Sequence, residues 1–408
     1  MPTHALSATA LLFATALSTV LSTVLPVAHA QNLIGEIGQP VETGTSGAWA
    51  RALATDDGWY MGVGTNGDFH IGALTQTGSS LNDWSFDRTA WVRGTDHGGL
   101  KDHAIRRCPD GTWLHVASTA NNDPNDSAYS WRLSSDFQIL ASGVVEENYP
   151  QRAHNDMATL CSPNVQGAVF TAFGGSTKTA TFFHIDETAN TSETQVIGEI
   201  LTEGASFLDD APTERIILVS ASHLYGLQID TFDYDLNLID HHELDVPPDN
   251  ERSFWPQRIL RIGQYYVIAA MSMNEAGGSD TGDVWLHVLD EEFNLLEQHR
   301  VTNYGSGRSS AMRPWMERMD DLLIVSYDIL TTHTFVAIQL NLDGVDDVDT
   351  GFPDAGGDGE SDDADGAEDA AAQGADAKEG GCSVAGGSVG GMALTLAMVA
   401  AARRRSSV

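Results

Sequence analysis

Arginine, histidine and tryptophan side chains gather in short segments that recur along the chain about every 50 residues. The candidates are Trp49, Arg51, His103, Arg152, His154, Trp255, Arg258, Arg313 and Trp315. Indole faces stack on sugar rings or cations, and a guanidinium offers a planar fork to a carboxylate or sulfate. The pattern predicts a site for a glycan or another anionic polymer. The competing interpretation is structural, with arginines paired to carboxylates between repeats and indoles filling the space between sheets.

Carboxylates and histidines near these segments raise the possibility of catalysis. His103 and His154 occupy matching positions beside Asp102 and Asp156, and Glu203 supplies a third carboxylate. Glycosidases need two or three carboxylates whose pKa values are driven apart, so a secreted glycan-processing hydrolase or lyase is the alternative function. No nucleophile elbow, His-Glu-x-x-His motif or phosphate loop occurs. We therefore expect a non-catalytic binding or adhesion module, with no metal site and no cofactor.

A repeated strand pattern positions these segments. Its template is residues 258–273, two apolar runs around Gly263, followed by alternating strands at 283–289 and 294–301. The second strand of the unit recurs six times, at residues 59–63, 113–117, 168–172, 216–220, 265–270 and 322–327. A fourth strand is predicted in five copies, at residues 90–93, 139–145, 194–200, 238–244 and 295–301. The sixth copy lacks a fourth strand because residues 342–344 run directly into an acidic tail.

The missing strand has a counterpart at the other end of the chain. Residues 32–41 resemble residues 196–204, which form the fourth strand of the third copy and lead into the fourth. Pairing of this segment with the last repeat closes a ring and leaves no long sheet edge exposed. We therefore predict an all-β fold, a six-bladed β-propeller of four-stranded antiparallel blades whose last blade is closed by the N-terminal strand. An open β-solenoid is the alternative architecture.

Cys108 and Cys161 occupy corresponding places in the second and third copies, after the first strand. Neighbouring blades bring such positions close, so the two residues form either a disulfide between blades or two separate buried thiols. An oxidising compartment is expected because residues 1–30 resemble a secretory signal, with an apolar run at 11–25 and a small-x-small pattern that ends at Ala30. The propeller is then expected to span residues 31–344.

The rest of the chain predicts an anchor. Residues 345–380 are rich in Asp, Gly, Ala and Glu, the composition of a disordered acidic linker. Residues 381–408 contain Cys382, an uncharged segment at 383–402, and then Arg403, Arg404 and Arg405. About 20 uncharged residues are enough to span a bilayer, with the arginines on the cytoplasmic side.

This C-terminal arrangement resembles the MYXO-CTERM sorting signal of myxobacteria and their relatives, over about the last 27 residues. The resemblance implies an exported precursor, a sorting protease that acts near Cys382, and display at the cell surface or outer membrane. Four glycines between 386 and 391 make the segment less apolar than a Leu-rich span. A glycan or extracellular polymer is the expected partner. Nucleic acid is not expected, because the formal net charge is −36 and basic residues concentrate only at Arg403–Arg405.

Overall fold

The computed structural model describes residues 32–345, except 66–67, 88–101, 119–126, 147–156, 171–177, 201–203, 222–225, 247–250, 275–281, 305–310 and 330. The predicted signal segment, acidic linker and sorting tail lie outside the described residues, as do Ala30, Cys382 and Arg403–Arg405. Within the described part of the chain, no helix is long and apolar enough to cross a membrane.

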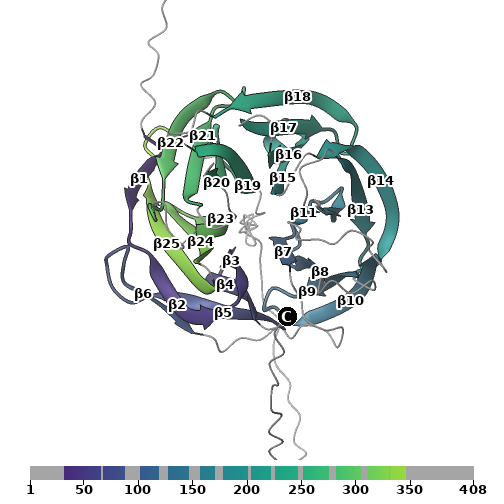
Figure 1. The fold of residues 1–408 in the computed structure, drawn as a ribbon. Helices are drawn as coiled ribbons and strands as arrows, with labels where there is room; N and C mark the ends of the chain where they lie inside the picture. The colour runs from purple at the N-terminus through teal and green to yellow at the C-terminus, as the bar shows by residue number, and fades with distance from the viewer. Residues whose placement is uncertain are drawn as a thin grey trace, which may run out of the picture. The chain divides into compact units, whose positions relative to one another are not determined.

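Six antiparallel sheets surround a central axis, which confirms the six-bladed propeller (Figure 1). The innermost strands are β3 (Ala48–Thr55), β7 (Asp102–Arg107), β11 (Met157–Cys161), β15 (Ala205–Asp210), β19 (Glu251–Ile262) and β23 (Ala311–Met319). The second strands are β4 (Gly58–Thr65), β8 (Trp113–Ser118), β12 (Gln166–Phe170), β16 (Arg215–Ala221), β20 (Tyr265–Asn274) and β24 (Leu322–Ile329). The third strands are β5 (Asp68–Gln76), β9 (Ala128–Leu133), β13 (Lys178–Ile185), β17 (Gly226–Phe232), β21 (Val284–Leu289) and β25 (Thr332–Leu340). The fourth strands of blades 1 to 5 are β6 (Trp84–Asp87), β10 (Ile139–Glu146), β14 (Thr191–Ile200), β18 (Leu238–Asp245) and β22 (Leu295–Arg300).

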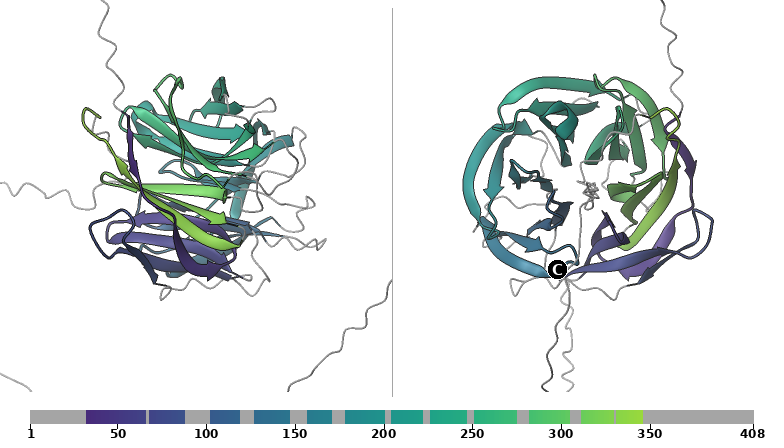
Figure 2. Two further views of the ribbon diagram at one scale, coloured as in Figure 1. Left: turned by 60° about the vertical axis from the view of Figure 1, so that its left-hand side comes forward. Right: turned by 180° about the vertical axis from the view of Figure 1, so that it is seen from behind.

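The N-terminal segment closes the sixth blade, as predicted. It forms two short strands, β1 (Ile34–Ile37) and β2 (Val41–Ser46), and both pair antiparallel with β25. The predicted segment 32–41 contains β1, whereas β2 extends the pairing beyond it to Ser46. Between the two strands the backbone N–H of Gln39 donates to Oδ1 of Asn82 at 2.5 Å, and Pro40 has no N–H group to donate to the ladder. The first and last described parts of the chain therefore lie side by side, as Figures 1 and 2 show.

One predicted strand is misplaced. The fourth strand of blade 1 is β6, several residues before the predicted segment 90–93, which falls outside the described residues. The chain returns early because the backbone N–H of Thr77 donates to the carbonyl of Asp83 at 2.6 Å and closes a compact loop. The geometry of this turn therefore sets the register of the strand. The apolar pattern of residues 90–93 contains no information about that turn.

The hydrophobic core lies between neighbouring blades. Val219 and Ile229 of blade 4 pack in one cluster with Ile268 of blade 5. The middle strands are therefore covered on both faces, and β8, β17 and β21 are buried along their whole length. This explains the largely apolar sequences of β8 and β21, because alternation is expected only where one face of a strand meets water. In β17 the buried positions include the polar residues Gln228, Asp230 and Thr231.

A recurring acidic turn joins the third and fourth strands of blades 3, 4 and 5. In blade 4 the carboxylate of Asp233 accepts backbone N–H groups from Asp235 at 3.0 Å and Asn237 at 2.8 Å. Between them, Leu236 has φ 59° and is buried. Blades 3 and 5 repeat the turn at Asp186 and Asp290. The turn thus orients one apolar side chain into the core of each of these blades.

Candidate functional site

The residues predicted to bind a ligand cluster where the innermost strands of blades 5, 6 and 1 are interrupted by β-bulges. The register of each strand with its neighbour shifts at Pro256/Arg258, Met312/Trp315 and Ala48/Arg51. Bulges turn side chains away from the regular alternation and are frequent next to functional sites. Here they bring Arg258, Trp315 and Arg51 into one stack.

Trp315 lies between two guanidinium groups. The Cζ atom of Arg51 is 4.7 Å from the centre of the indole, and that of Arg258 is 4.9 Å from it. The three residues are only 1 to 2% exposed. Arg51 also donates to the carbonyls of His103 and Arg313, each at 3.2 Å. This stack joins blades 5, 6 and 1, and Arg51 extends it to blade 2.

Arg258 forms a buried ion pair with Glu317. One guanidinium nitrogen donates to the Glu317 carboxylate, and Nε donates to the carbonyl of Met316 at 3.1 Å. Burial raises the pKa of Glu317 above its ordinary range, although the charge of Arg258 opposes the shift. Burial likewise lowers the pKa of Arg258, with Glu317 opposing it. Removal of either partner alone would leave a desolvated charge.

A second pair joins blades 1 and 6. The Cζ atom of Arg313 lies 3.7 Å from the centre of the Trp49 indole, and both residues have positive φ, 56° and 68°. The buried carboxylate of Asp328 accepts the Trp49 N–H at 2.6 Å and bonds to Nδ1 of His333 at 2.9 Å. Burial by itself would raise the pKa of Asp328, but these hydrogen bonds and nearby cations hold it below its ordinary value. The carboxylate thereby fixes the bulge that orients Trp49.

His103 belongs to a buried aromatic stack between blades 1 and 2. Phe69 contacts His103 at 4.5 Å and His115 at 4.2 Å between ring centres, and His115 stacks on Trp131 at 5.0 Å. Neither ring nitrogen of His115 has a hydrogen-bond partner among the described residues. Burial lowers the pKa of His115 to about 3 and that of His103 well below 6.5. Both rings are therefore neutral at neutral pH.

We expect the His115→Phe substitution to flatten the loss of stability in acid. Below pH 6.5 the unfolded chain protonates His115 whereas the folded protein does not, so stability falls by up to about 1.4 kcal/mol per pH unit until pH 3. Urea unfolding of both proteins between pH 7.5 and 4 measures this difference. His241→Gln is the contrasting variant. In the wild-type protein the pKa of His241 is raised, chiefly by the hydrogen bond to Asp230, so His241 stabilises the fold below pH 6.5. Loss of His241 should therefore make stability fall more steeply as the pH is lowered. Parallel curves for His115→Phe would contradict the assignment.

The predicted residues thus have different environments. Four of them are buried and contact neighbouring blades, as expected if their role is to hold the blades together: Arg51, His103, Arg258 and Trp315. Arg313 and Trp255 are partly exposed, and Trp255 lies on β19. Arg152 and His154 lie outside the described residues, as do Asp156 and Glu203, and only the backbone of Asp102 is described. No group of three or more metal-ligating side chains occurs in the described part of the chain.

A cavity of about 380 Å³ lies at the opposite, C-terminal ends of the innermost strands. Its polar lining combines five arginines with three carboxyl groups: Arg106, Arg107, Arg258, Arg261, Arg318, Asp209, Asp210 and Glu317. The remaining wall is apolar and includes Leu160, Leu208, Leu260 and three prolines. Cations outnumber carboxylates here, the reverse of the ratio in the whole chain.

The arginines of the cavity differ in their partners. Arg107 forms a two-point pair with Asp56 at 2.9 and 2.6 Å, and Arg261 binds Asp210 at 2.7 Å. Arg106, from blade 2, donates to the carbonyl of Phe207 in blade 4 and makes no salt bridge with a described residue. The described partner of Arg106 is therefore a backbone carbonyl and not a carboxylate.

Asp209 lies in the same cavity with a weakened tendency to ionise. Burial raises its pKa, although the hydroxyl of Tyr234, 3.1 Å from its carboxylate, opposes the shift. The Asp209 carboxyl group therefore ionises less readily than an exposed aspartate does.

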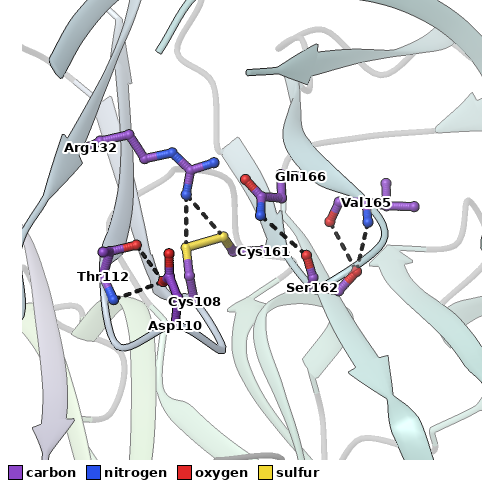
Figure 3. The surroundings of a disulfide bond; sticks show 8 residues. All are labelled: Cys108, Asp110, Thr112, Arg132, Cys161, Ser162, Val165 and Gln166. Carbon is purple, nitrogen blue, oxygen red and sulfur yellow. Dashed lines mark hydrogen bonds between the residues drawn. A yellow bond between two sulfur atoms is a disulfide. The ribbon is translucent and has the colours of Figure 1, made fainter. Parts of the chain in front are cut away.

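Cys108 and Cys161 form a disulfide (Figure 3) with a Cα separation of 5.0 Å. Both residues line the cavity. The bond links the end of the first strand in blade 2 to that in blade 3. Nη1 of Arg132, on β9, lies 3.1 Å from Sγ of Cys108 and 3.4 Å from Sγ of Cys161. The sequence left open a disulfide or two separate buried thiols, and the structure contains the disulfide.

Sequence reasoning overlooked most of this cavity. The predicted site residues lie at the start of the first strand in each blade, whereas the cavity is lined by residues at the end of that strand. A signal was present, because Arg107, Arg261 and Arg318 all stand one or two residues before the turn between the first and second strands. Alignment of the repeats at that turn would have grouped them.

Comparison with known proteins supports the fold alone. No protein-family model matches the sequence, and the search for similar curated proteins finds no match either. A solved protein of unknown function from Dyadobacter fermentans has a TM-score of 0.54 at 11% identity, covering 76% of this chain and 100% of that chain. An α-L-arabinofuranosidase from Lactobacillus brevis has a TM-score of 0.39 at 12% identity, covering 58% and 88%. A xylan β-1,4-xylosidase from Bacillus halodurans has a TM-score of 0.37 at 11% identity, covering 74% and 54%. The two enzyme similarities are too weak to support an argument about activity.

Proposed function

We propose that the protein is exported and displayed at the cell surface, where it acts as a non-catalytic binding module for an acidic glycan or another anionic polymer. The observation that carries this proposal is the cavity in which five arginines face three carboxyl groups within a chain of net charge −36. A cavity of about 380 Å³ falls in the size range of ordinary ligand sites and accommodates one terminal acidic unit.

Arg106 is the residue best suited to bind the acidic group. It makes no salt bridge with a described residue, and its planar guanidinium matches a carboxylate or sulfate. The surrounding prolines and leucines lower the local dielectric, which strengthens a charged hydrogen bond. The apolar wall also favours contact with the less polar face of a sugar ring.

Export and anchoring rest on the two ends of the sequence. The apolar segment before Ala30 supports secretion, and Cys382 with its following uncharged segment and three arginines supports sorting to the surface. A sorting protease and the membrane are the corresponding partners. A binding module on an acidic linker suits contact with polymers outside the cell.

We expect Arg106→Gln to weaken binding of an acidic glycan by about 10- to 100-fold, because a charged hydrogen bond contributes about 1.5 to 3 kcal/mol. A glycan array on the purified protein identifies the ligand, and isothermal titration measures the change. Arg215→Gln is the matched control, because it removes an exposed arginine from β16 that does not line the cavity. Wild-type binding should also weaken with added salt.

Two results would contradict the proposal. One is equal loss of affinity in Arg106→Gln and Arg215→Gln, which would indicate a nonspecific charge effect. The other is the absence of saturable binding to any acidic glycan or polymer.

A hydrolase or lyase on the same scaffold is the alternative. It is favoured by the two carboxyl groups, Asp209 and Glu317, that line the cavity and whose pKa values are raised by burial, since a general acid must be protonated at working pH. Release of shortened products from a bound glycan would support this alternative over the binding module.

A further inference from the structure

The Cys108–Cys161 disulfide stands at the wall of the cavity rather than inside a blade. Both cysteines line the cavity together with Pro109 and Pro163, the residues that begin or continue the adjoining turns. Both residues are nearly buried, with Cys108 2% exposed and Cys161 6% exposed. Both cysteines face the same cavity, so access alone does not distinguish their sulfur atoms.

The surroundings of the disulfide contain an unusual cation. Arg132 is 6% exposed, makes no salt bridge with a described residue, and donates from Nη1 toward both sulfur atoms (Figure 3). Its Nε has no hydrogen-bond partner among the described residues. Asp110, Glu187 and Asp186 act on its charge only across longer distances. A buried cation without an ion-pair partner is unfavourable, and a neutral disulfide does little to offset it.

A thiolate at Cys108 would supply the missing negative charge. Nη1 of Arg132 is nearer to Cys108 than to Cys161, by 3.1 against 3.4 Å. A nearby cation lowers the pKa of a thiol and makes the thiolate a better leaving group. Attack on Cys161 therefore releases the better leaving group, the Cys108 thiolate.

We propose that the Cys108–Cys161 disulfide is a redox-modification site, reduced by a small dithiol that enters the cavity of the folded propeller, with Cys161 as the attacked sulfur and Cys108 as the leaving group held by Arg132. This inference does not depend on the nature of the polymer that the protein binds.

The reaction proceeds in two exchange steps. A thiolate of the dithiol attacks Sγ of Cys161, the S–S bond breaks, and its electron pair leaves with Sγ of Cys108 as a thiolate. The second thiolate of the dithiol then attacks the dithiol sulfur in the mixed disulfide and releases the Cys161 thiolate. The dithiol becomes a cyclic disulfide, and the protein disulfide gains two electrons. Solvent supplies the protons.

Reduction would separate two turns at the edge of the cavity. The disulfide joins the turn that contains Pro109 in blade 2 to the end of β11 in blade 3, just before the turn that contains Pro163. Without the bond, these two walls are connected only by packing between the blades. The redox state would therefore adjust the width of the cavity.

The test measures the rate of reduction of the full-length protein by dithiothreitol at pH 8 without denaturant. The wild-type rate should rise linearly with dithiol concentration. Arg132→Met should react about tenfold more slowly, because a rise of about two units in the thiol pKa acts on the rate with a coefficient of about 0.5. Arg132→Lys keeps the charge and should stay within about threefold of wild type. Arg215→Met, which removes an exposed arginine on β16 outside the cavity, is the matched control and should react like wild type.

A second measurement identifies the attacked sulfur. Brief exposure to glutathione followed by iodoacetamide should place glutathione on Cys161 and the alkyl group on Cys108, with peptide mapping to separate both from Cys382. The proposal is overturned if glutathione is found on Cys108, or if Arg132→Met is reduced as fast as wild type. It is also overturned if the wild-type rate becomes independent of dithiol concentration and equals the rate of global unfolding, because reduction would then require an unfolded chain.

Discussion

Replacement of Leu33 and Ile34 by alanine is expected to lower the free energy of unfolding by about 4 kcal/mol or more. Both side chains are buried in the cluster that contains Val336 and Ile338 of β25. Truncation of one buried leucine or isoleucine typically costs about 2 to 5 kcal/mol, and these two are neighbours, so their costs need not add. Urea unfolding at neutral pH measures the difference.

The reason for so large an effect is the closure of the ring. The backbone N–H of Leu33 donates to the carboxylate of Glu297 on β22 at 2.8 Å, and β1 pairs with β25. Loss of this strand would expose the edge of β25 in addition to the apolar cluster. Glu36→Ala is the control, since Glu36 is exposed on the same strand and should change stability by less than about 0.5 kcal/mol. Similar unfolding midpoints for all three proteins would show that closure contributes little.

The second large effect concerns the buried ion pair. Glu317→Ala is expected to destabilise the propeller by about 3 to 5 kcal/mol, because it leaves the Arg258 guanidinium buried without its partner carboxylate. Arg258 cannot avoid the cost by losing its proton, since arginine remains charged in proteins. Thermal and urea unfolding of the variant at pH 7 measure the loss.

A double variant separates the cost of an unpaired charge from the value of the pair. Arg258→Met with Glu317→Leu removes both charges and keeps apolar volume beside Trp315, so it should be much closer to wild type than Glu317→Ala. If the double variant is as unstable as the single one, the pair and the cation stack on Trp315 stabilise the blades directly. The desolvation argument would then fail.

Much of the fold could be predicted because its signals are local. Turns such as the one at Gly263 and the short apolar runs that follow them mark strands without reference to distant residues. The position of β6 could not be found this way, because a hydrogen bond between Thr77 and Asp83 sets it. The pattern of residues 90–93 is strand-like, and no local feature shows that an earlier strand takes the fourth place.

The candidate site was less accessible to sequence reasoning. Arg51, Arg258 and Trp315 were identified as a set, and they do meet in space, but only their burial between blades shows that they contact one another instead of facing solvent. Arg106 was overlooked because its importance comes from its contact with Phe207, which lies two blades further along the ring. The residues next to Arg106 in the sequence do not indicate which residues it contacts on other blades.

By itself, the sequence determined the repeat, the number of blades and the N-terminal strand that completes the last one, because strand and turn preferences act within a few residues. It also limited Cys108 and Cys161 to two possible states. Only the tertiary structure decided that these cysteines are joined, which arginines are buried in pairs, and which face a cavity. Those outcomes depend on how six separate sheets pack around one axis, and burial and pairing are properties of that packing rather than of any single segment.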